Sequence, residues 1–344
     1  MQKDLDHILI HTKVFWEDLR DRRIFVTGGT GFFGSWLLES FAHANDQLRL
    51  NAQMVVLTRN PQSFQQKAPH LANRSDIQFH VGDVRDFKFP EGKFSHVIHA
   101  ATEASAKLNE ETPRLMLDTI IDGTRRALDF SIECGAKKFL LTSSGAIYGK
   151  QPSDMPRIPE EYSGAPDCTS NQSAYGEGKR VSELLCAIYS QRHGLETKIA
   201  RCFAFVGPHL PLDVHFAIGN FIRDAMAGNA IIIKGDGTPF RSYLYSADLA
   251  IWLWTILFRG IPNRPYNVGS RNYVTIAETA AAVSAALRGQ VPVNVLQKAD
   301  PAKPAQRYVP ETLRAQNELN LDEWVKLEDA IRRTAQWHQK KDNI

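Results

Sequence analysis

The first half of the chain alternates short apolar runs with longer amphipathic stretches. The apolar runs are nearly continuous, rich in β-branched residues, and lie at 22–28, 52–58, 77–83, 95–101, 137–143 and 197–203. Strands that are covered on both faces have this composition, because neither face meets water. The stretches at 32–44, 114–134 and 173–193 have the apolar spacing of helices. The alternation predicts an α/β fold, with a doubly wound parallel sheet and helices on both of its faces.

The pattern loosens after about residue 203 into short strands, helices and turn-rich pieces such as NRPYNVGS. We therefore expect three parts. These are a helical extension at 1–21, a sheet domain at 22–203, and a smaller mixed α/β lobe at 204–344 from which the chain can return to the sheet.

The composition fits a globular protein and argues against several other classes. Of 344 residues, 43% are hydrophobic and 23% are charged, and the net charge of +3 is too small to point to nucleic acid. No run approaches the roughly 20 apolar residues of a membrane span. The N-terminus lacks the apolar core of a secretory signal. We therefore expect a cytoplasmic protein without a nucleic-acid or membrane partner.

The sequence does not indicate a metal site or a disulfide framework. The four cysteines include no CxxC pair. His96 and His99 fall on one predicted strand but point to opposite faces of it. Buried or edge histidines are therefore a better interpretation of this pair than metal ligands.

The first predicted strand ends in a glycine-rich turn, VTGGTGFFG, at 26–34. Gly28, Gly31 and Gly34 are three residues apart, and Gly29, Gly31 and Gly34 also satisfy G-x-G-x-x-G. Such a turn lets backbone amides approach a pyrophosphate and directs the N-terminus of the next helix at it. A glycine cluster is often a simple turn, but this one stands between a strand and an apolar helix at the head of the sheet. The sequence therefore predicts a Rossmann-type dinucleotide-binding domain.

The end of the second strand bears on the choice of dinucleotide. Where an acid would bind the adenosine ribose of NAD, the chain has Thr58, Arg59 and Asn60. Arg59 matches the 2′-phosphate of NADP, which we favour. The alternative is NAD, with Arg59 solvated or stacked on adenine. Asp83, at the end of the third strand, is placed either to bind the adenine amino group or to cap the next helix.

A tyrosine and a lysine share one face of a predicted helix. In SAYGEGK, at 173–179, Tyr175 and Lys179 are four residues apart. A tyrosine has an ordinary pKa of ~10, but a nearby ammonium stabilises its phenolate. The spacing alone is a common accident. Its place in the chain strengthens it, because the pair follows both the glycine turn and the strand FLLTSSGAIYG, which contains Ser144.

These three motifs and a fourth, RSYLYSADLA, resemble the extended short-chain dehydrogenase/reductases, in particular the NAD(P)-dependent nucleotide-sugar epimerase/dehydratase branch. The resemblance runs from about residue 22 to residue 338. It implies a nucleoside-diphosphate sugar as substrate and a C-terminal lobe that mainly binds it. It also implies a homodimer formed by the helices at 114–134 and 173–193.

The resemblance further implies a catalytic triad of Ser144, Tyr175 and Lys179. Tyr175 would take the proton of a sugar hydroxyl while hydride passes to nicotinamide, Ser144 would bond the same oxygen, and Lys179 would bind the nicotinamide ribose and tune Tyr175. A 4-keto sugar results. Dehydratases of the family then use an Asp and a Glu that directly follow the strand, and decarboxylases keep the glutamate. This chain has Gly145 and Ala146 there.

The two small residues favour an epimerase, in which a transient 4-keto sugar turns over and is reduced on its other face. They also suggest a gap, which would suit a sugar that turns and could equally be filled by substrate. Three alternatives stay open. They are an NADPH-dependent 4-keto nucleotide-sugar reductase, a dehydratase or decarboxylase that takes its acid from Glu103, and a non-catalytic dinucleotide-binding module.

The resemblance also implies two sets of contacts. The cofactor-binding residues are Gly28, Thr30, Gly31, Phe32, Phe33, Gly34, Arg59, Asp83, Val84, Ala100, Ala101 and Lys179. The substrate-binding residues are Thr102, Glu103, Ser143, Asn220, Arg241 and Arg307. Both arginines suit a diphosphate, because a guanidinium meets phosphate oxygens pairwise. The chain departs from the family at Ala204 and Ile120, where relatives often carry Asn.

Overall fold

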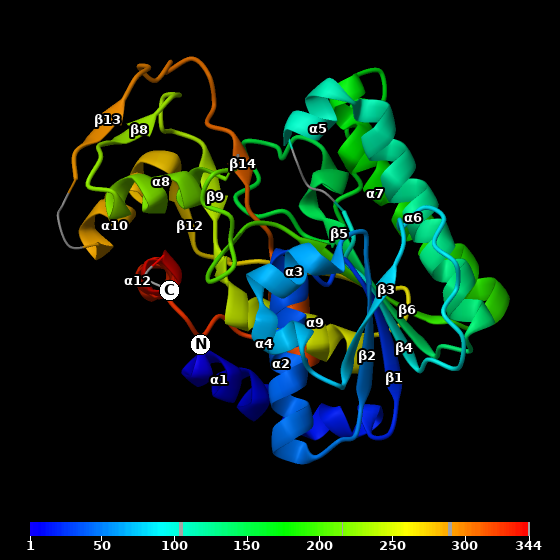
Figure 1. Ribbon diagram of the computed structural model, residues 1–344. Coiled ribbons are helices and arrows are strands. Elements are labelled where there is room, and N and C mark those ends of the chain that lie inside the picture. The colour runs from blue at the N-terminus through cyan, green and yellow to red at the C-terminus, as the bar shows by residue number, and fades with distance from the viewer. Residues whose placement is uncertain (103–105, 215, 288–290, 343–344) are drawn as a thin grey trace.

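The computed structural model describes residues 1–102, 106–214, 216–287 and 291–342 (Figure 1). Its main feature is a seven-stranded sheet in the order β11-β6-β5-β4-β1-β2-β3, in which every neighbouring pair is parallel. The strands are β1 (Arg23–Thr27), β2 (Gln53–Thr58), β3 (Ile77–Val81), β4 (His96–His99), β5 (Lys138–Ser144), β6 (Glu196–Cys202) and β11 (Pro265–Val268). The predicted doubly wound α/β fold is confirmed.

Six of these strands correspond to the predicted apolar runs, with ends that differ by one or two residues. The seventh, β11, comes from the turn-rich region after residue 203 and pairs with β6 at the edge of the sheet. The helices are α1 (Gln2–Thr12), α2 (Phe32–Leu48), α3 (Pro61–Lys67), α4 (Pro69–Ala72), α5 (Ala106–Glu111), α6 (Pro113–Glu133), α7 (Ala174–His193), α8 (Ala217–Met226), α9 (Ser246–Arg259), α10 (Ile276–Ala286), α11 (Leu313–Leu319) and α12 (Leu327–Asp342), with 3-10 turns η1 (Lys13–Leu19), η2 (Gly145–Tyr148) and η3 (Asn171–Ser173).

Helices cover both faces of the sheet (Figure 1). α6 and α7 lie on one face, and α2 and α9 lie on the other. Successive strand residues explain the two layers, because Phe25 joins the core under α6 whereas Ile24 and Val26 join the core under α2 and α9. Both faces are therefore apolar, which is why the strands read as continuous hydrophobic runs.

The residues that follow β6 build a second lobe beside the sheet (Figure 1). Its strands are β7 (Phe205–Val206), β8 (Ile231–Ile233), β9 (Phe240–Ser242), β10 (Leu244–Tyr245), β12 (Tyr273–Thr275), β13 (Val293–Val295) and β14 (Arg307–Tyr308). β9 lies between β12 and β14 in a small mixed sheet. α9 and β11 lie between lobe segments in the sequence but pack with the main sheet.

The N-terminal extension forms part of the core. The Trp16 ring is fully buried, with its centroid 4.6 Å from that of Trp254 on α9. Asp4 on α1 accepts hydrogen bonds from Tyr245 at 3.2 Å and from Arg333 of α12 at 2.7 Å. The extension thereby joins the sheet domain to the C-terminal helix. Within the described residues, no helix is both long enough and apolar enough to cross a membrane.

Candidate functional site

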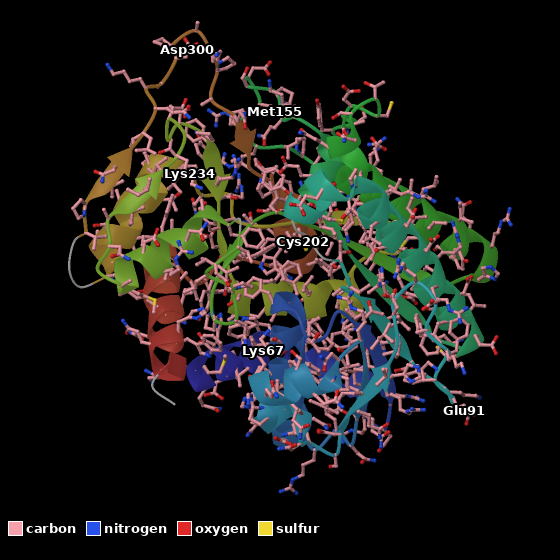
Figure 2. All side chains as sticks on the ribbon, turned by 45° about the horizontal axis from the view of Figure 1, so that its top comes forward. Lys67, Glu91, Met155, Cys202, Lys234 and Asp300 are labelled. Atoms are coloured by element: carbon pink, nitrogen blue, oxygen red, sulfur yellow. The ribbon has the colours of Figure 1, made fainter. Side chains whose placement is uncertain are left out.

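The carboxyl ends of the parallel strands meet at the edge of the sheet next to the lobe. Ligands of such sheets bind at this edge, where the strand order reverses. The order reverses here between β1 and β4, which are neighbours. Ser144 ends β5 and is the register partner of Cys202, the last residue of β6. Figure 2 labels Cys202 near the centre of the view. Ser144 Oγ lies 3.5 Å from the Tyr308 hydroxyl of β14, so the predicted reaction centre lies where the sheet meets the lobe.

The glycine turn brings three backbone segments into direct contact. A Cβ on Gly28 would lie 2.5 Å from the carbonyl carbon of Ala100, and one on Gly34 would lie 2.2 Å from the carbonyl oxygen of Gly28. Gly28 also has a φ of +72°, in the region that favours glycine. Gly31 is the N-cap of α2 and provides no side-chain cap, so amides of the first turn are left for a ligand. These features fit the pyrophosphate of a dinucleotide.

A buried histidine supports the turn from behind. His99 Nδ1 lies 2.8 Å from Thr27 Oγ1, and the same threonine oxygen accepts from the Ala101 amide at 3.2 Å. His99 Nε2 lies 3.2 Å from Thr124 Oγ1 of α6. Burial, and then the charge of Lys179, lowers the pKa of His99 to about 3. The histidine is therefore a neutral structural link.

The other histidine of the pair has a different environment. His96 Nδ1 lies 2.8 Å from Ser95 Oγ, and burial lowers the pKa of His96 to about 4. The prediction of buried histidines is thus confirmed for both residues. In the part of the chain that the structure describes, no group of three His, Cys, Asp or Glu side chains is arranged to hold a metal ion.

Ser144 and Tyr175, two of the predicted catalytic residues, lie together. Ser144 Oγ accepts from the Ala146 amide at 3.1 Å and is hydrogen-bonded to the Tyr175 hydroxyl. Burial raises the pKa of Tyr175 to about 12, and the bond with Ser144 opposes this rise. The Tyr175 amide donates to Asn109 Oδ1 at 3.1 Å, which holds the first turn of α7. With a pKa of about 12, Tyr175 is a neutral phenol at pH 7.

Lys179 lies one turn further along α7 and is almost fully buried. Its ammonium donates to the Thr142 carbonyl oxygen at 2.7 Å and to Thr102 Oγ1 at 2.8 Å. Burial lowers the pKa of Lys179 to about 8. Among the described residues, its bonds thus go to the strand ends and not to the Tyr175 phenol.

The small residues after β5 do not leave an open gap. A Cβ on Gly145 would lie 2.7 Å from ring atoms of Phe203, so this ring already fills the space. The Phe203 ring centroid lies 4.7 Å from that of Tyr308. The expectation of room for a turning sugar at Gly145 is therefore wrong. Ala146, the next residue, is partly exposed.

The two predicted diphosphate-binding arginines lie in the lobe. Arg241 Nη1 donates to the Phe240 carbonyl oxygen at 2.8 Å. The Arg307 guanidinium carbon lies 4.2 Å from the Phe240 ring centroid, and Arg307 Nη1 is buried without a hydrogen-bond partner among the described residues. Neither arginine is ion-paired within that part of the chain. Both are therefore free to bind an anion.

Ser143 does not join Ser144 at the site. Consecutive strand residues point to opposite faces, and Ser143 Oγ donates to Glu183 Oε1 at 2.5 Å. Glu183 is also ion-paired with Arg201 at 2.7 Å. Ser143 thus belongs to a polar cluster under α7, and a direct contact with substrate would require this cluster to rearrange.

The remaining predicted substrate residues are Thr102, which accepts from Lys179, and Asn220 and Glu103. Asn220 Oδ1 on α8 accepts from Arg223 at 3.2 Å. Glu103 lies outside the described residues. One departure from the family has a clear packing role: Ile120 is buried, and a Cβ on Gly178 of α7 would lie 3.2 Å from it.

The predicted cofactor residues surround the glycine turn. Arg59 is exposed at the end of β2, and Lys67 Nζ donates to the Thr30 carbonyl oxygen at 3.2 Å. The Asp83 carboxylate accepts from Arg85 Nε at 2.8 Å, and chiefly for this reason its pKa is lowered. An adenine amino group would share Asp83 with Arg85. The Phe33 ring, next to Phe32, packs edge-on against Phe205, and Val84 lies beside Gly123 of α6.

Two aromatic residues at the reaction centre were not among the predicted site residues. Tyr308 Oη lies 3.5 Å from Ser144 Oγ, although β14 is a two-residue strand after a proline-rich segment. Phe203 directly follows β6. The sequence positions of the two residues could have indicated them. Phe203 follows a strand that ends at the site, and Tyr308 is adjacent to the predicted Arg307.

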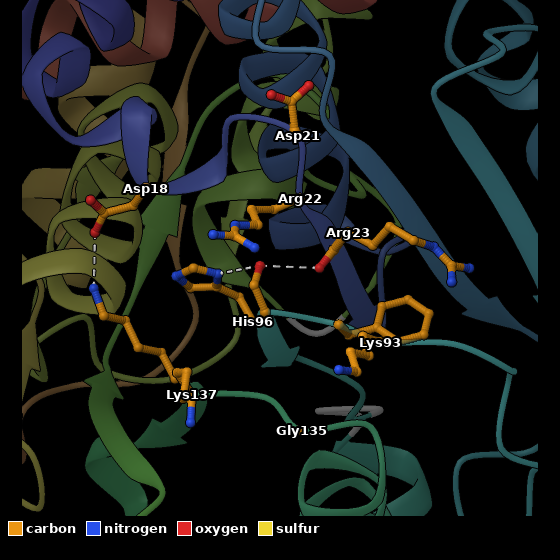
Figure 3. A pocket seen from close by; sticks show the side chains of 11 residues that line it. Asp18, Asp21, Arg22, Arg23, Lys93, His96, Gly135 and Lys137 are labelled. Atoms are coloured by element: carbon orange, nitrogen blue, oxygen red, sulfur yellow. Dashed lines mark hydrogen bonds and ion pairs between the residues drawn. The ribbon is translucent and has the colours of Figure 1, made fainter.

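A cavity of about 540 Å³ lies at the opposite edge of the sheet (Figure 3). Its walls include Arg22, Arg23, His96 and Lys137, at the amino ends of β1, β4 and β5. Asp18 and Lys138 form an ion pair of 3.0 Å at one side of the cavity. Because ligands of parallel sheets bind at the carboxyl ends, this cavity is separate from the reaction centre.

Comparisons with known proteins agree with this geometry. The family model described as "NAD dependent epimerase/dehydratase family" matches residues 24–269. UDP-glucuronic acid decarboxylase 6 of Arabidopsis thaliana is 30% identical over 323 residues, which cover 94% of this chain and 90% of that protein.

Two solved structures share the fold. An epimerase from Methanothermobacter thermautotrophicus has a TM-score of 0.80 at 22% identity, covering 98% of this chain and 96% of that one. A dTDP-glucose 4,6-dehydratase from Streptomyces venezuelae, solved with NAD bound, has a TM-score of 0.77 at 21% identity, covering 93% of this chain and 98% of that one.

The contact at Gly28 can be tested against a glycine with the same backbone angle. Gly28 and Gly228 both have a φ of +72°, but a Cβ on Gly228 would meet nothing within 4 Å. We expect Gly228→Ala to cost about 1–2 kcal/mol of unfolding free energy from backbone strain alone. Gly28→Ala should cost more and also abolish NADH binding, as measured by urea denaturation and fluorescence titration. Equal effects of the two variants on binding and stability would contradict the proposed role of the turn.

Proposed function

Because the chain belongs to the NAD dependent epimerase/dehydratase family, we propose that it is an NAD(P)-dependent nucleotide-sugar epimerase acting through a transient 4-keto sugar. The observation that carries the proposal is the placement of Ser144, Tyr175 and Lys179 at the strand ends, next to positions without a carboxylate. Gly145 and Ala146 cannot transfer a proton, so a 4-keto sugar formed here has no acid at these positions to drive elimination.

The roles of the side chains derive from their contacts. Tyr175, as phenolate, takes the proton of the sugar C4 hydroxyl, and Ser144 donates to the same oxygen. When bound, the nicotinamide dinucleotide supplies the acceptance and return of hydride at that carbon. Tyr175 then returns the proton after the sugar has turned. Arg241 and Arg307 hold the diphosphate throughout, so the sugar can turn without leaving.

Lys179 has a part in this scheme that depends on its burial. Its ammonium lies at the ends of β4 and β5, where a ribose hydroxyl can reach it. With a pKa of about 8, it still carries a proton at pH 7 in most molecules. A positive charge one helical turn from Tyr175 favours the phenolate. The residue thus links cofactor binding to the ionisation of the base.

A second candidate is the decarboxylation of UDP-glucuronate, which the similarity to the Arabidopsis decarboxylase favours. Oxidation at C4 would place a ketone β to the C6 carboxylate, and a β-keto acid loses CO₂ readily. The first step and its residues are the same in both candidates. The second step differs, since the glutamate that the family's decarboxylases keep is Ala146 in this chain.

We further propose that the dinucleotide is NADP rather than NAD. Arg59 is exposed at the end of β2, and neither Thr58 nor Asn60 is acidic, although the charge of Asp83 after the next strand interacts with Arg59. Lys67 adds a cation beside the turn. A 2′-phosphate would be attracted by both charges.

The subunits are proposed to pair through α6 and α7. These helices pack together and carry exposed apolar side chains, with Leu184 61% and Ile188 38% exposed. The two residues are four apart on α7 and share one face. Pairing of two copies would bury this face in a four-helix bundle.

The reaction can be tested with UDP-, dTDP-, GDP- and CDP-sugars, including UDP-glucuronate, by NMR analysis of the products. We expect an epimer without added reductant. Release of CO₂ from UDP-glucuronate would instead establish the second candidate, and a strict need for NADPH would establish a reductase. Tyr175→Phe should lower kcat by at least about a hundredfold and leave NADPH binding intact. Tyr189→Phe, whose hydroxyl bonds Asp129, serves as the control. Retained turnover in Tyr175→Phe would refute the mechanism.

The cofactor preference rests on Arg59. Arg59→Ala should weaken NADPH binding by about tenfold, the value of one charged contact, while NADH binding changes little. Isothermal titration with both nucleotides measures the difference. Arg114→Ala, an exposed arginine on α6, controls for the loss of surface charge. Equal weakening of NADPH and NADH would show that Arg59 does not meet the 2′-phosphate.

The subunit pairing rests on Leu184. Leu184→Glu places a charge in the middle of the proposed interface, and we expect it to convert a dimer into a monomer in light scattering coupled to gel filtration. Val14→Glu, at a residue that is 73% exposed on the N-terminal extension, should remain dimeric. A monomeric native protein would rule the interface out.

A further inference from the structure

Tyr308 is held at the reaction centre by hydrogen bonds of its segment to the lobe and to the sheet domain. On the lobe side, Tyr308 is the register partner of Arg241 on β9, and the Phe240 amide donates to the Gln306 carbonyl oxygen at 2.7 Å. On the sheet-domain side, the amide of Val309 donates to Gln151 Oε1 at 2.9 Å. The position of Tyr308 is therefore fixed by the main chain on both sides of it.

The ring of Tyr308 is fixed as well. It packs against Phe203, at 4.7 Å between ring centroids, and Phe203 occupies the space beside Gly145. This packing leaves the hydroxyl of Tyr308 3.5 Å from Ser144 Oγ. A full O–H···O bond is about 2.7–2.8 Å long, so this contact is loose and can shorten when a ligand closes the site.

The contact with Tyr308 matters because Ser144 can make only a limited number of hydrogen bonds. A serine hydroxyl has one proton to donate and accepts about two bonds. The Ala146 amide takes one acceptor position. If Tyr308 donates to the other, the single proton of Ser144 is left for Tyr175 or for a sugar oxygen in its place. Without the Tyr308 hydroxyl, that proton is free to turn away from Tyr175.

Tyr308 is suited to act as a donor. Burial raises its pKa far above the ordinary value, so Tyr308 is protonated at neutral pH. Tyr175 differs from it, since the mechanism requires Tyr175 to lose its proton. The same strand also carries Arg307, and Arg241 is the register partner of Tyr308. The two arginines proposed to bind the diphosphate are therefore next to Tyr308 in this small sheet.

We propose that Tyr308 is a positioning residue of the reaction centre. Its hydroxyl donates to Ser144 Oγ and thereby directs the Ser144 proton to the oxygen of Tyr175, where it stabilises the phenolate. The role in turnover rests on the proposed function, whereas the effect on the ionisation of Tyr175 is a property of the protein itself.

The test uses Tyr308→Phe, which removes only the hydroxyl and keeps the packing against Phe203. Without a directed Ser144 proton, the phenolate loses a bond, so the pKa of Tyr175 should rise by about one unit. Ultraviolet difference titration of the full-length protein, with and without NAD⁺, measures this rise. The Tyr175→Phe variant identifies which part of the signal belongs to Tyr175. Tyr266→Phe, whose hydroxyl bonds Glu318 at 2.9 Å, should leave the Tyr175 titration unchanged.

With a nucleotide sugar that the protein converts, Tyr308→Phe should lower kcat about tenfold with little change in KM. The rise of kcat/KM with pH should move to higher pH. In a Ser144→Ala background, Tyr308→Phe should have no further effect, because its action passes through Ser144.

The outcomes separate this inference from the proposed function. A rise in the Tyr175 pKa with no turnover of any nucleotide sugar would support the inference and overturn the proposed function. Turnover with an unchanged Tyr175 titration in Tyr308→Phe would overturn the inference alone. The inference would also be overturned if the loss of kcat in the double variant equalled the product of the losses in Ser144→Ala and Tyr308→Phe.

Discussion

The close backbone approach at Gly28 and Gly34 is the constraint on which the site depends. It brings the end of β1, the end of β4 and the first turn of α2 closer than any Cβ would permit. A buried series of hydrogen bonds connects the end of β1 with helices α6 and α7. Thr27 bonds His99 at 2.8 Å, His99 bonds Thr124 at 3.2 Å, and Thr124 bonds Ser182 at 2.8 Å. Ser182 stands on α7, one turn from Lys179, so the helix that bears Tyr175 is linked to the strand that precedes the glycine turn.

The charges of the site result from the same burial. Burial, and then the charge of Lys179, keeps His99 neutral, and burial also lowers the pKa of Lys179 to about 8. Tyr175 shows the opposite effect, since burial raises its pKa to about 12 and only Ser144 opposes the rise. In the protein alone, Tyr175 is therefore too weak an acid to ionise at neutral pH, and the Lys179 ammonium is bonded to the strand ends instead of to Tyr175. In the proposed mechanism a bound dinucleotide and sugar would complete the electrostatics, which would make the ionisation of Tyr175 depend on occupancy of the site.

The sequence predicts the sheet well because its signal is local. A strand buried on both faces reads as an unbroken apolar run, and six strands are recognisable in this way. β11 is not, because its four residues, PYNV, include a proline and an asparagine and stand among turn residues. The glycine turn and the spacing of Tyr175 and Lys179 are local too. Phe203 and Tyr308 are brought to Ser144 by the packing of distant segments, and no pattern within either segment records it.

The proposed scheme divides the site between two parts of the structure. Its first step, oxidation at the sugar carbon, would use Ser144, Tyr175 and Lys179, whose contacts lie within the sheet domain. The surroundings of a 4-keto sugar would depend instead on the junction with the lobe, where Phe203 fills the place beside Gly145 and packs on Tyr308. An acid introduced at position 145 would have to displace Phe203 and would disturb Tyr308 with it. A carboxylate at position 145 would therefore require coupled changes at Phe203 and Tyr308, whereas position 146, where the family's decarboxylases keep their glutamate, is partly exposed.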